Sequence, residues 1–459
     1  MTFDRSGATT QPALLGQVIH LAWPVVIEQL LLHLVGLSDT LITGRLLAVD
    51  QLAAVTVASY LMWFVASIQV VSSAGATALV ARRVGAGRRQ DAIEVSHQAL
   101  LLACGVGLAL LGVGLALAPR AVRWMNLDGS AAREAVDYLR VTLMAVPLLA
   151  IQTTSIACLR GAGDTKTGLA IMAVVNSLNI ALSWAAAVGA LGLPRMGLRG
   201  VALGTAVAES LGGCLVIAAL AAGRGGLAFR LRWFRPRLPI LRDLMRIGLP
   251  AFGEGLTNAG CQLWFLGLIN RLGPTATAAH GVAIRCEAIA FLTVTAFSVA
   301  ASTLTGLYLG AGQPESARRA ALVSWRLGTG VITFLALLIL AGAEPLFQLF
   351  LGDGQPGVAP LGIPVLRLVA LALPALATLT VLGGALRGAG DTRSPWLIVT
   401  LGYLLVRIPL TYLLAVERPP LGLPGGLLGA WIAMFADLHV RALLTALWFR
   451  AGRWQRLVF

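Results

Sequence analysis

Two carboxylates lie inside one apolar stretch near the start of the chain, in the sequence IEQLLLHLVGLSDTLITG. Glu28 and Asp39 are eleven residues apart, so on an α-helix they project about 20° apart and lie about 16 Å apart along the axis. A carboxylate inside a membrane costs about 2.5 to 3.5 kcal/mol, and such groups typically carry protons or pair with ions. We expect Asp39 to handle an ion, the alternative being a structural contact with a neighbouring helix; for Glu28 neither interpretation is favoured.

A later stretch, VVNSLNIALSW, places polar residues on one helix face. Asn176, Asn179 and Ser183 stand there at i, i+3 and i+7, and Thr205 lies in the next apolar stretch. Their amide and hydroxyl groups can hold a proton-carrying carboxylate or coordinate a small cation through oxygen. The predicted cation-coupling site is therefore Asp39, Asn179, Thr205 and Ser183, with ordinary packing as the alternative for the two hydroxyls.

A second set of charges lies in the other apolar stretches. Glu209 follows Thr205 by one helical turn. Arg285 and Glu287 stand at i, i+2 and cannot pair face to face, so we expect each to bond across helices, as we also expect of Arg407 and of Asp437. Possible secondary polar sites are Glu28, Glu254, Asn176, Arg285 and Glu287. We expect no metal site and no disulfide, because the five cysteines show no paired spacing.

Composition places these residues in a membrane. The chain of 459 residues is 58% hydrophobic and 12% charged, against about 25% charged in soluble domains. Apolar stretches of membrane-spanning length lie at about 17–44, 51–80, 93–118, 136–159, 168–191, 200–222, 244–271, 277–308, 317–342, 361–386, 395–416 and 425–449. Because backbone groups in lipid must bond within their own segment, these stretches predict an all-α membrane protein with twelve transmembrane helices.

The chain is one unit written twice. RGAGDT occurs at two places 227 residues apart, with matching residues around each copy. We expect a six-helix lobe over residues 1–222, a basic cytoplasmic linker over 223–243 and a second six-helix lobe over 244–459. An even number of helices in each half makes the halves parallel repeats around a central cleft, as in several transporters.

RGAGDT has a structural interpretation in both halves. Its glycines permit a turn, Asp164 and Asp391 can cap the following helix, and Arg160 and Arg387 hold the cytoplasmic face. It lacks the Lys and the Ser or Thr that a phosphate-binding loop needs. Glu28 and Glu254 also repeat, each four residues after a proline, so they could bond backbone groups that the proline leaves without a partner.

The predicted coupling site is not repeated. At the repeat offsets, Asp39, Asn179, Ser183 and Thr205 correspond to Phe265, Val406, Leu410 and Trp431. Residues with a structural role common to both halves should occur at the matching positions of both halves. The asymmetry therefore predicts one ion-handling site, in the first half.

Charge predicts the orientation. The two ends and alternate connections carry 20 Lys and Arg, against 8 in the opposite connections. Because cytoplasmic loops carry the excess of Lys and Arg, we expect a multi-pass protein of the cell (inner) membrane with both termini in the cytoplasm. The net charge of +15 then follows from topology and neighbouring anionic lipids, which disfavours nucleic acid as a partner.

Several strings together resemble the multidrug and toxic compound extrusion (MATE) family. They are PVVIEQLLLHLVGLSDTLITGRL, VARRVGAG, LYLGAG, CLRGAGDTKT, ALRGAGDTRS and HGVAIRCEAIAF, and they extend over nearly the whole chain. The resemblance implies an antiporter that exchanges protons or sodium for hydrophobic, often cationic drugs. It implies that Asp39 is the coupling acid and that Asn179 and Thr205 are its neighbours. The family pattern LNIxLD appears here as LNIALS, so Ser183 replaces a second acid and a proton is the simpler coupling ion than sodium.

The predicted function is thus secondary active multidrug export. We expect a monomer in the lipid bilayer that binds drug-like small molecules, uses an ion gradient without a cofactor and is not an enzyme, because no catalytic cluster is present. The alternative is a flippase for lipid-linked oligosaccharides or a related lipid of the same superfamily. Such a protein needs arginine side chains that bind the pyrophosphate group of the lipid. Arg285 and Arg407 lie within apolar stretches and keep this alternative open.

Overall fold

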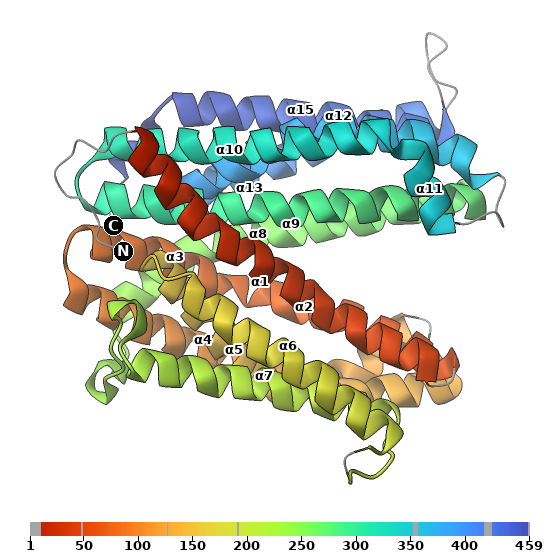
Figure 1. Ribbon diagram of the computed structural model, residues 1–459, viewed down its shortest axis with the longest axis horizontal. Helices are drawn as coiled ribbons and strands as arrows, with labels where there is room; N and C mark the ends of the chain where they lie inside the picture. Colours follow the sequence, from red (N-terminus) through yellow and green to blue (C-terminus); the bar gives the residue numbers. More distant parts are fainter. Residues whose placement is uncertain are drawn as a thin grey trace. The chain divides into compact units, whose positions relative to one another are not determined.

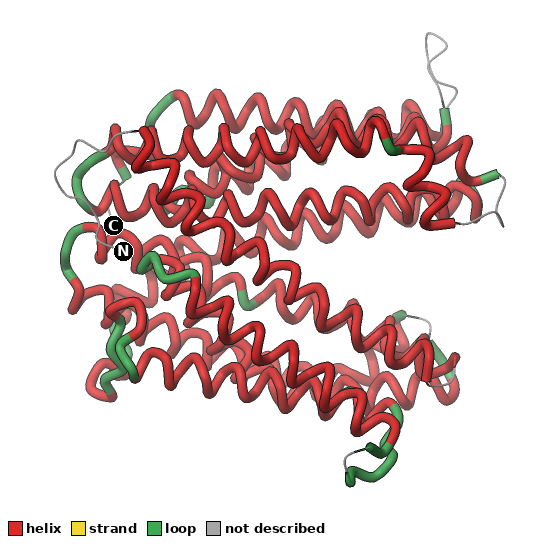
Figure 2. The backbone as a smooth tube through the Cα atoms, viewed as in Figure 1, coloured by secondary structure: helices red, strands yellow, loops and turns green. Residues whose placement is uncertain are grey.

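The computed structural model describes residues 11–46, 49–125, 127–190, 192–351, 357–416 and 425–457. This part of the chain consists of helices joined by loops, and Figure 2 shows no strand in it. The helices up to the basic segment are α1 (Gln11–Leu46), α2 (Val49–Ile68), α3 (Val70–Gly85), α4 (Arg89–Trp124), α5 (Gly129–Gly161), α6 (Lys166–Val188) and α7 (Leu198–Ala221). Those after it are α8 (Leu238–Arg271), α9 (Pro274–Gly310), α10 (Pro314–Ala341), α11 (Ala343–Leu351), α12 (Val358–Gly388), α13 (Arg393–Gly402), α14 (Ile408–Thr411) and α15 (Gly426–Arg450) (Figure 1).

Every predicted membrane span is helical in the structure. Within the described residues, eleven helical stretches are long and apolar enough to cross a membrane. The one other predicted span, α8, which is the seventh in chain order, is 34 residues long but more polar, because it carries Glu254, Asn258 and Gln262. The predicted all-α membrane class, with six long helical spans in each half, is confirmed.

Two spans depart from regular helices. The second is interrupted at Gln69 between α2 and α3, where Ser72 Oγ donates to the Gln69 carbonyl oxygen at 2.9 Å and competes with the helical ladder. The eleventh contains π-helical turns at Tyr403–Arg407 and Tyr412–Val416, on either side of α14. Such turns are often found at functional sites, and neither interruption was predicted.

The described chain divides into two compact units. The first comprises residues 23–252, and the second comprises residues 11–22 together with 253–457. Both divisions fall inside a long helix, near Pro24 of α1 and Pro250 of α8. A proline inside a helix removes one backbone hydrogen bond and permits a bend. The two repeated prolines thus mark the places where α1 and α8 pass from one unit to the other.

The basic segment is docked on the first unit. Gln98 of α4 donates from Nε2 to the Trp233 carbonyl oxygen at 2.8 Å and accepts from the Arg237 backbone N–H at 2.9 Å. Arg237 also pairs with Glu94 at 2.6 Å. These contacts satisfy backbone groups of the segment and hold it against the start of α4.

Candidate functional site

Asp39 lies in the second part of α1 with its side chain buried. Its Oδ2 atom accepts two hydrogen bonds, from Thr205 Oγ1 at 2.8 Å and from the Tyr138 hydroxyl at 3.1 Å. Its Oδ1 atom has no hydrogen-bond partner among the described residues. Donors from α5 and α7 therefore hold one carboxylate oxygen and leave the other available for a proton or a cation.

Asn179 of α6 extends this group of contacts. Its Nδ2 donates to Thr205 Oγ1 at 2.9 Å, and its Oδ1 accepts from Ser38 Oγ of α1 at 3.3 Å. An amide offers donors and an acceptor at once, which lets Asn179 join α1 to α7. The predicted trio of Asp39, Asn179 and Thr205 is thus brought together from three helices, and Tyr138 of α5 joins it from a fourth.

Thr205 can respond to the protonation of Asp39. Its Oγ1 lies 2.8 Å from Asp39 Oδ2 and 3.1 Å from the Val201 carbonyl oxygen, but a hydroxyl has only one proton to donate. When Asp39 is ionised, donation to the carboxylate is the stronger bond. When Asp39 carries a proton, the acid can donate to Thr205, and the threonine proton can turn to Val201. Protonation therefore changes the contacts between α1 and α7.

Ser183 lies beside this group on α6. Its hydroxyl donates to the Val201 carbonyl oxygen at 3.2 Å, the same acceptor that faces Thr205. A Cβ on Gly204 would overlap the backbone and hydroxyl of Ser183, so α6 and α7 are in very close contact here. Ser183, the fourth residue of the predicted site, thus makes a contact between α6 and α7 beside the other three.

The repeated glutamates pair with the arginines of RGAGDT. Arg160 Nη2 lies 2.8 Å from Glu28 Oε1, and Arg387 Nη1 lies 3.0 and 3.1 Å from the two carboxylate oxygens of Glu254. The expectation that the glutamates bond backbone loosened by the prolines is therefore wrong, because an arginine on another helix occupies each carboxylate. One ion pair is built twice.

The capping role of the motif is confirmed. Asp164 Oδ1 accepts from the Thr167 backbone N–H, and Asp391 Oδ1 accepts from that of Ser394, each at 3.1 Å. These bonds satisfy amides in the first turns of α6 and α13, which have no partner inside the helix. RGAGDT therefore joins three elements in each half: the turn, the following helix and the helix that carries the repeated glutamate.

An aromatic contact replaces the candidate site in the second half. Phe265 and Trp431, the counterparts of Asp39 and Thr205, meet edge to face with ring centroids 6.2 Å apart. The Arg407 guanidinium lies 4.7 Å from the centre of the Phe265 ring. The same pair of helix positions thus makes a hydrogen bond in one half and an apolar contact in the other.

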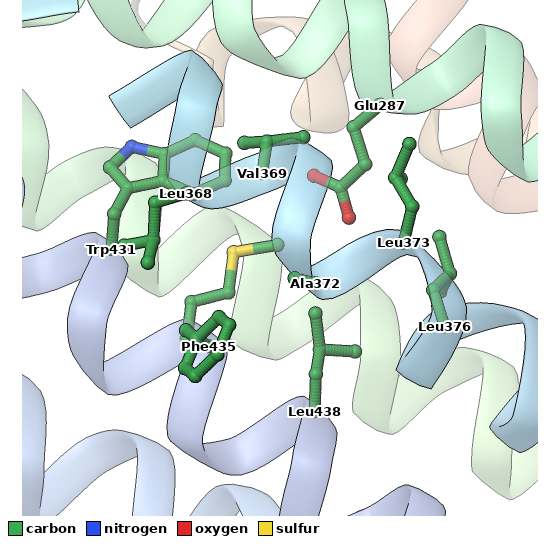
Figure 3. A pocket seen from close by; sticks show the side chains of 10 residues that line it. Glu287, Leu368, Val369, Ala372, Leu373, Leu376, Trp431, Phe435 and Leu438 are labelled. Carbon is green, nitrogen blue, oxygen red and sulfur yellow. The ribbon is translucent and has the colours of Figure 1, made fainter. Parts of the chain in front are cut away.

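The other secondary residues make no hydrogen bond to Asp39, Asn179 or Thr205 in the described part of the chain. Asn176 donates to the Met172 carbonyl oxygen of its own helix at 2.8 Å, and Arg285 is exposed. Glu287 Oε2 has no hydrogen-bond partner in the described part of the chain, so its predicted bond across helices is not present there. Figure 3 shows the Glu287 carboxylate directed into a pocket lined by apolar side chains, among them Trp431 and Leu373.

Within the described residues, the expected bond across helices is present for Arg407 but not for Asp437. Asp437 instead pairs within α15 with Arg441, whose Nε lies 2.9 Å from Asp437 Oδ1, and both side chains are buried. Arg407 Nη2 lies 3.5 Å from Gln262 Oε1 of α8. The i, i+4 spacing of Asp437 and Arg441 favours this pairing because it puts both on one helix face.

Comparison with known proteins identifies the fold and the family. The sequence model of the MatE family matches residues 24–185 and 250–413, one segment in each half. The chain belongs to the MatE family. A probable multidrug resistance protein NorM of Thermotoga maritima is 29% identical over 445 residues, 97% of this chain and 94% of that protein. Another protein of that name, from Aromatoleum aromaticum, is 30% identical over 423 residues, 91% of this chain and 90% of that protein.

Solved structures share the MatE fold. A MOP superfamily transporter from Pyrococcus furiosus superposes with a TM-score of 0.87 at 22% identity and covers 95% of each chain. A MATE protein in its bent conformation gives a TM-score of 0.87 at 22% identity, over 96% of this chain and 97% of that one. The sequence-based resemblance to the family is thus confirmed, and with it a multi-pass membrane protein.

Sequence reasoning missed two members of the candidate site in this MatE protein. Tyr138 comes from α5, and Ser38 directly precedes Asp39. The available signal for Tyr138 was a lone phenol in an apolar stretch, since a buried hydroxyl needs a partner. Its partner lies 99 residues away, a pairing that helical spacing does not reveal.

Proposed function

We propose that this chain is a secondary active exporter that exchanges protons for small, hydrophobic and often cationic molecules, with Asp39 as the proton carrier. The observation that carries the proposal is a buried carboxylate bonded by donors from other helices in one half, where the other half has an aromatic contact. Membership of the MatE family and relatives named as multidrug resistance proteins support export of drug-like substrates.

In the proposed cycle, Asp39 takes a proton from the outer side. The carboxylate loses its charge, so the bonds from Thr205 and Tyr138 weaken and α1 can shift against α5 and α7. Loss of the proton to the cytoplasm restores these bonds. Because α1 contains Pro24, its second part can move by bending at that position. The two protonation states thus favour two positions of α1. The change between these positions is how the proton controls the access of substrate to its binding site.

The driving force suffices for export. One elementary charge moving through 100 mV supplies about 2.3 kcal/mol, which supports a roughly 50-fold gradient of a neutral solute. The excess of basic residues in alternate connections supports an inner-membrane orientation with both termini in the cytoplasm. Neither a bound metal nor an organic cofactor has a role in this proposal.

The test is drug movement in proteoliposomes. Ethidium or norfloxacin movement is measured under an imposed pH gradient and then under a sodium gradient, for the wild type and for Asp39→Asn. Proton-driven movement that is lost in the variant supports the proposal. Sodium-driven movement keeps the exporter and makes the oxygens of Asp39, Asn179 and Thr205 candidate sodium ligands. No movement under either gradient contradicts the proposal and favours the lipid flippase.

A further inference from the structure

A cavity of about 260 Å³ lies within the first unit, with both apolar and polar side chains in its wall. Five helices, α1, α3, α5, α6 and α7, contribute to its wall. Its polar lining includes Glu28, Gln29, Gln152, Thr153, Arg160 and Glu209. A space of this size with several hydrogen-bonding groups can hold a group of water molecules. Water held by these polar groups would give protons a path inside the membrane-spanning part of the unit.

Glu209 is the exceptional residue in this lining. Glu28 is paired with Arg160 at 2.8 Å, whereas Glu209 has no ion pair among the described residues. Its Oε2 atom is buried and has no hydrogen-bond partner in the described part of the chain. A half-buried carboxylate with one buried, unbonded oxygen and no cation beside it is costly when charged, so its position against this cavity needs an explanation.

Glu209 links the cavity to Asp39. It lies one turn after Thr205 on α7, on the same helix face and about 6 Å along the axis. Thr205 Oγ1 donates to Asp39 Oδ2, and Glu209 itself lines the cavity. Thr205 and Glu209 therefore connect the candidate carboxylate, along one face of α7, with the cavity that Arg160 also lines.

The charged groups around Glu209 are few. Glu28 of α1 and Arg160 of α5 line the same cavity, and Asp39 of α1 accepts from Thr205, one turn before Glu209. α3 and α6 line the cavity with uncharged side chains, such as Thr77 and Met172. Since Arg160 is already engaged by Glu28, charging both Asp39 and Glu209 would bring two unneutralised carboxylates together in a region of low dielectric. The two acids are therefore suited to share one proton.

We propose that Glu209 receives the proton that Asp39 releases and passes it to water in the cavity, on the way to the cytoplasm; this rests on the proposed proton exchange at Asp39. In the first step the O–H bond of protonated Asp39 breaks and the Glu209 carboxylate gains the proton. In the second step Glu209 loses it to cavity water and becomes a carboxylate again. One proton moves, and no other reactant is consumed. The second half has Phe435 at the matching position, so the relay belongs to the first half.

The test compares Glu209→Gln with a matched control, Glu315→Gln, which changes an exposed glutamate at the start of α10. Proton-driven drug movement is measured in proteoliposomes over a range of internal pH, and drug binding is measured in detergent. We expect Glu209→Gln to move drug about tenfold or more slowly, with an altered pH profile and unchanged drug binding, and Glu209→Asp to recover part of the rate. The control should match the wild type.

A chemical readout keeps the test independent of folding in the variants. Dicyclohexylcarbodiimide modifies protonated carboxyl groups in apolar surroundings, so wild-type protein should be labelled at Glu209 and less so at higher pH. Two results would overturn this inference alone while proton-driven movement in the wild type stands. One is that Glu209→Gln moves drug with the same rate and pH profile as the wild type, and the other is that Glu209 is not labelled. A wild type that does not respond to a proton gradient overturns the proposed function, and the relay with it.

Discussion

The repeated ion pair supports a prediction with an internal comparison. We consider Glu28→Gln and Arg160→Met in the first half, and Glu254→Gln and Arg387→Met in the second. The side chains of the first pair are 5% and 19% exposed, and those of the second are 16% and 27% exposed. Each single change leaves one charge without its partner in a largely dehydrated place, and each double change removes both charges.

The magnitude follows from burial. Removing one partner of a buried pair costs about 3–5 kcal/mol, while an exposed pair contributes about 0.2–1 kcal/mol. From the exposures of the two pairs, we expect losses of about 2–3 kcal/mol for Glu28→Gln or Arg160→Met. For the second pair we expect about 1–2 kcal/mol. In a unit of about 230 residues, each kcal/mol lowers the melting temperature by about 2–4 °C.

The assay is thermal melting of the detergent-solubilised protein in a double-mutant cycle for each pair. The Glu28→Gln and Arg160→Met variants should each melt about 5–10 °C lower, and the double variant should lose much less than the sum of the two. The second pair should show the same pattern with smaller losses. Strict additivity in both cycles would refute the claim that these residues are coupled as ion pairs.

Two further predictions concern the contacts of the candidate site. Thr205→Val and Tyr138→Phe should each slow proton-driven drug movement in proteoliposomes by about tenfold or more, because each removes a hydrogen bond of about 1.5–3 kcal/mol to a charged group; wild-type rates in both would contradict their role. Gly204→Ala should destabilise the protein by about 1–3 kcal/mol in thermal melts, since its Cβ would overlap α6, while Gly105→Ala, which has open space on α4, should not.

The sequence predicts most of the fold because the membrane imposes it. Long apolar stretches must become helices, and the structure has a helix at each of them. The sequence did not predict the interruption at Gln69, because this interruption depends on the Ser72 hydroxyl one turn later and on the packing around it. The short helix α11 was also not predicted, because its nine residues are too few for a membrane span.

The candidate site was predictable where helical spacing and the repeat both gave a signal. Asp39, Asn179 and Thr205 stood out because polar residues on apolar faces had apolar counterparts 226 or 227 residues later. Tyr138 did not, because its bond to Asp39 depends on how α5 packs against α1. The pairing of Glu28 with Arg160 had a signal in the sequence, since both residues repeat together with their motifs, but repetition alone does not say which residues touch.

The central claim is that Asp39 carries the coupling proton. The most direct test loads proteoliposomes with a pH-sensitive dye, imposes a drug gradient without a pH gradient and compares the wild type with Asp39→Asn. The wild type should drive protons in the direction opposite to the drug, while the variant should move drug down its gradient with no proton movement. Drug-driven proton movement that persists in Asp39→Asn would contradict the account.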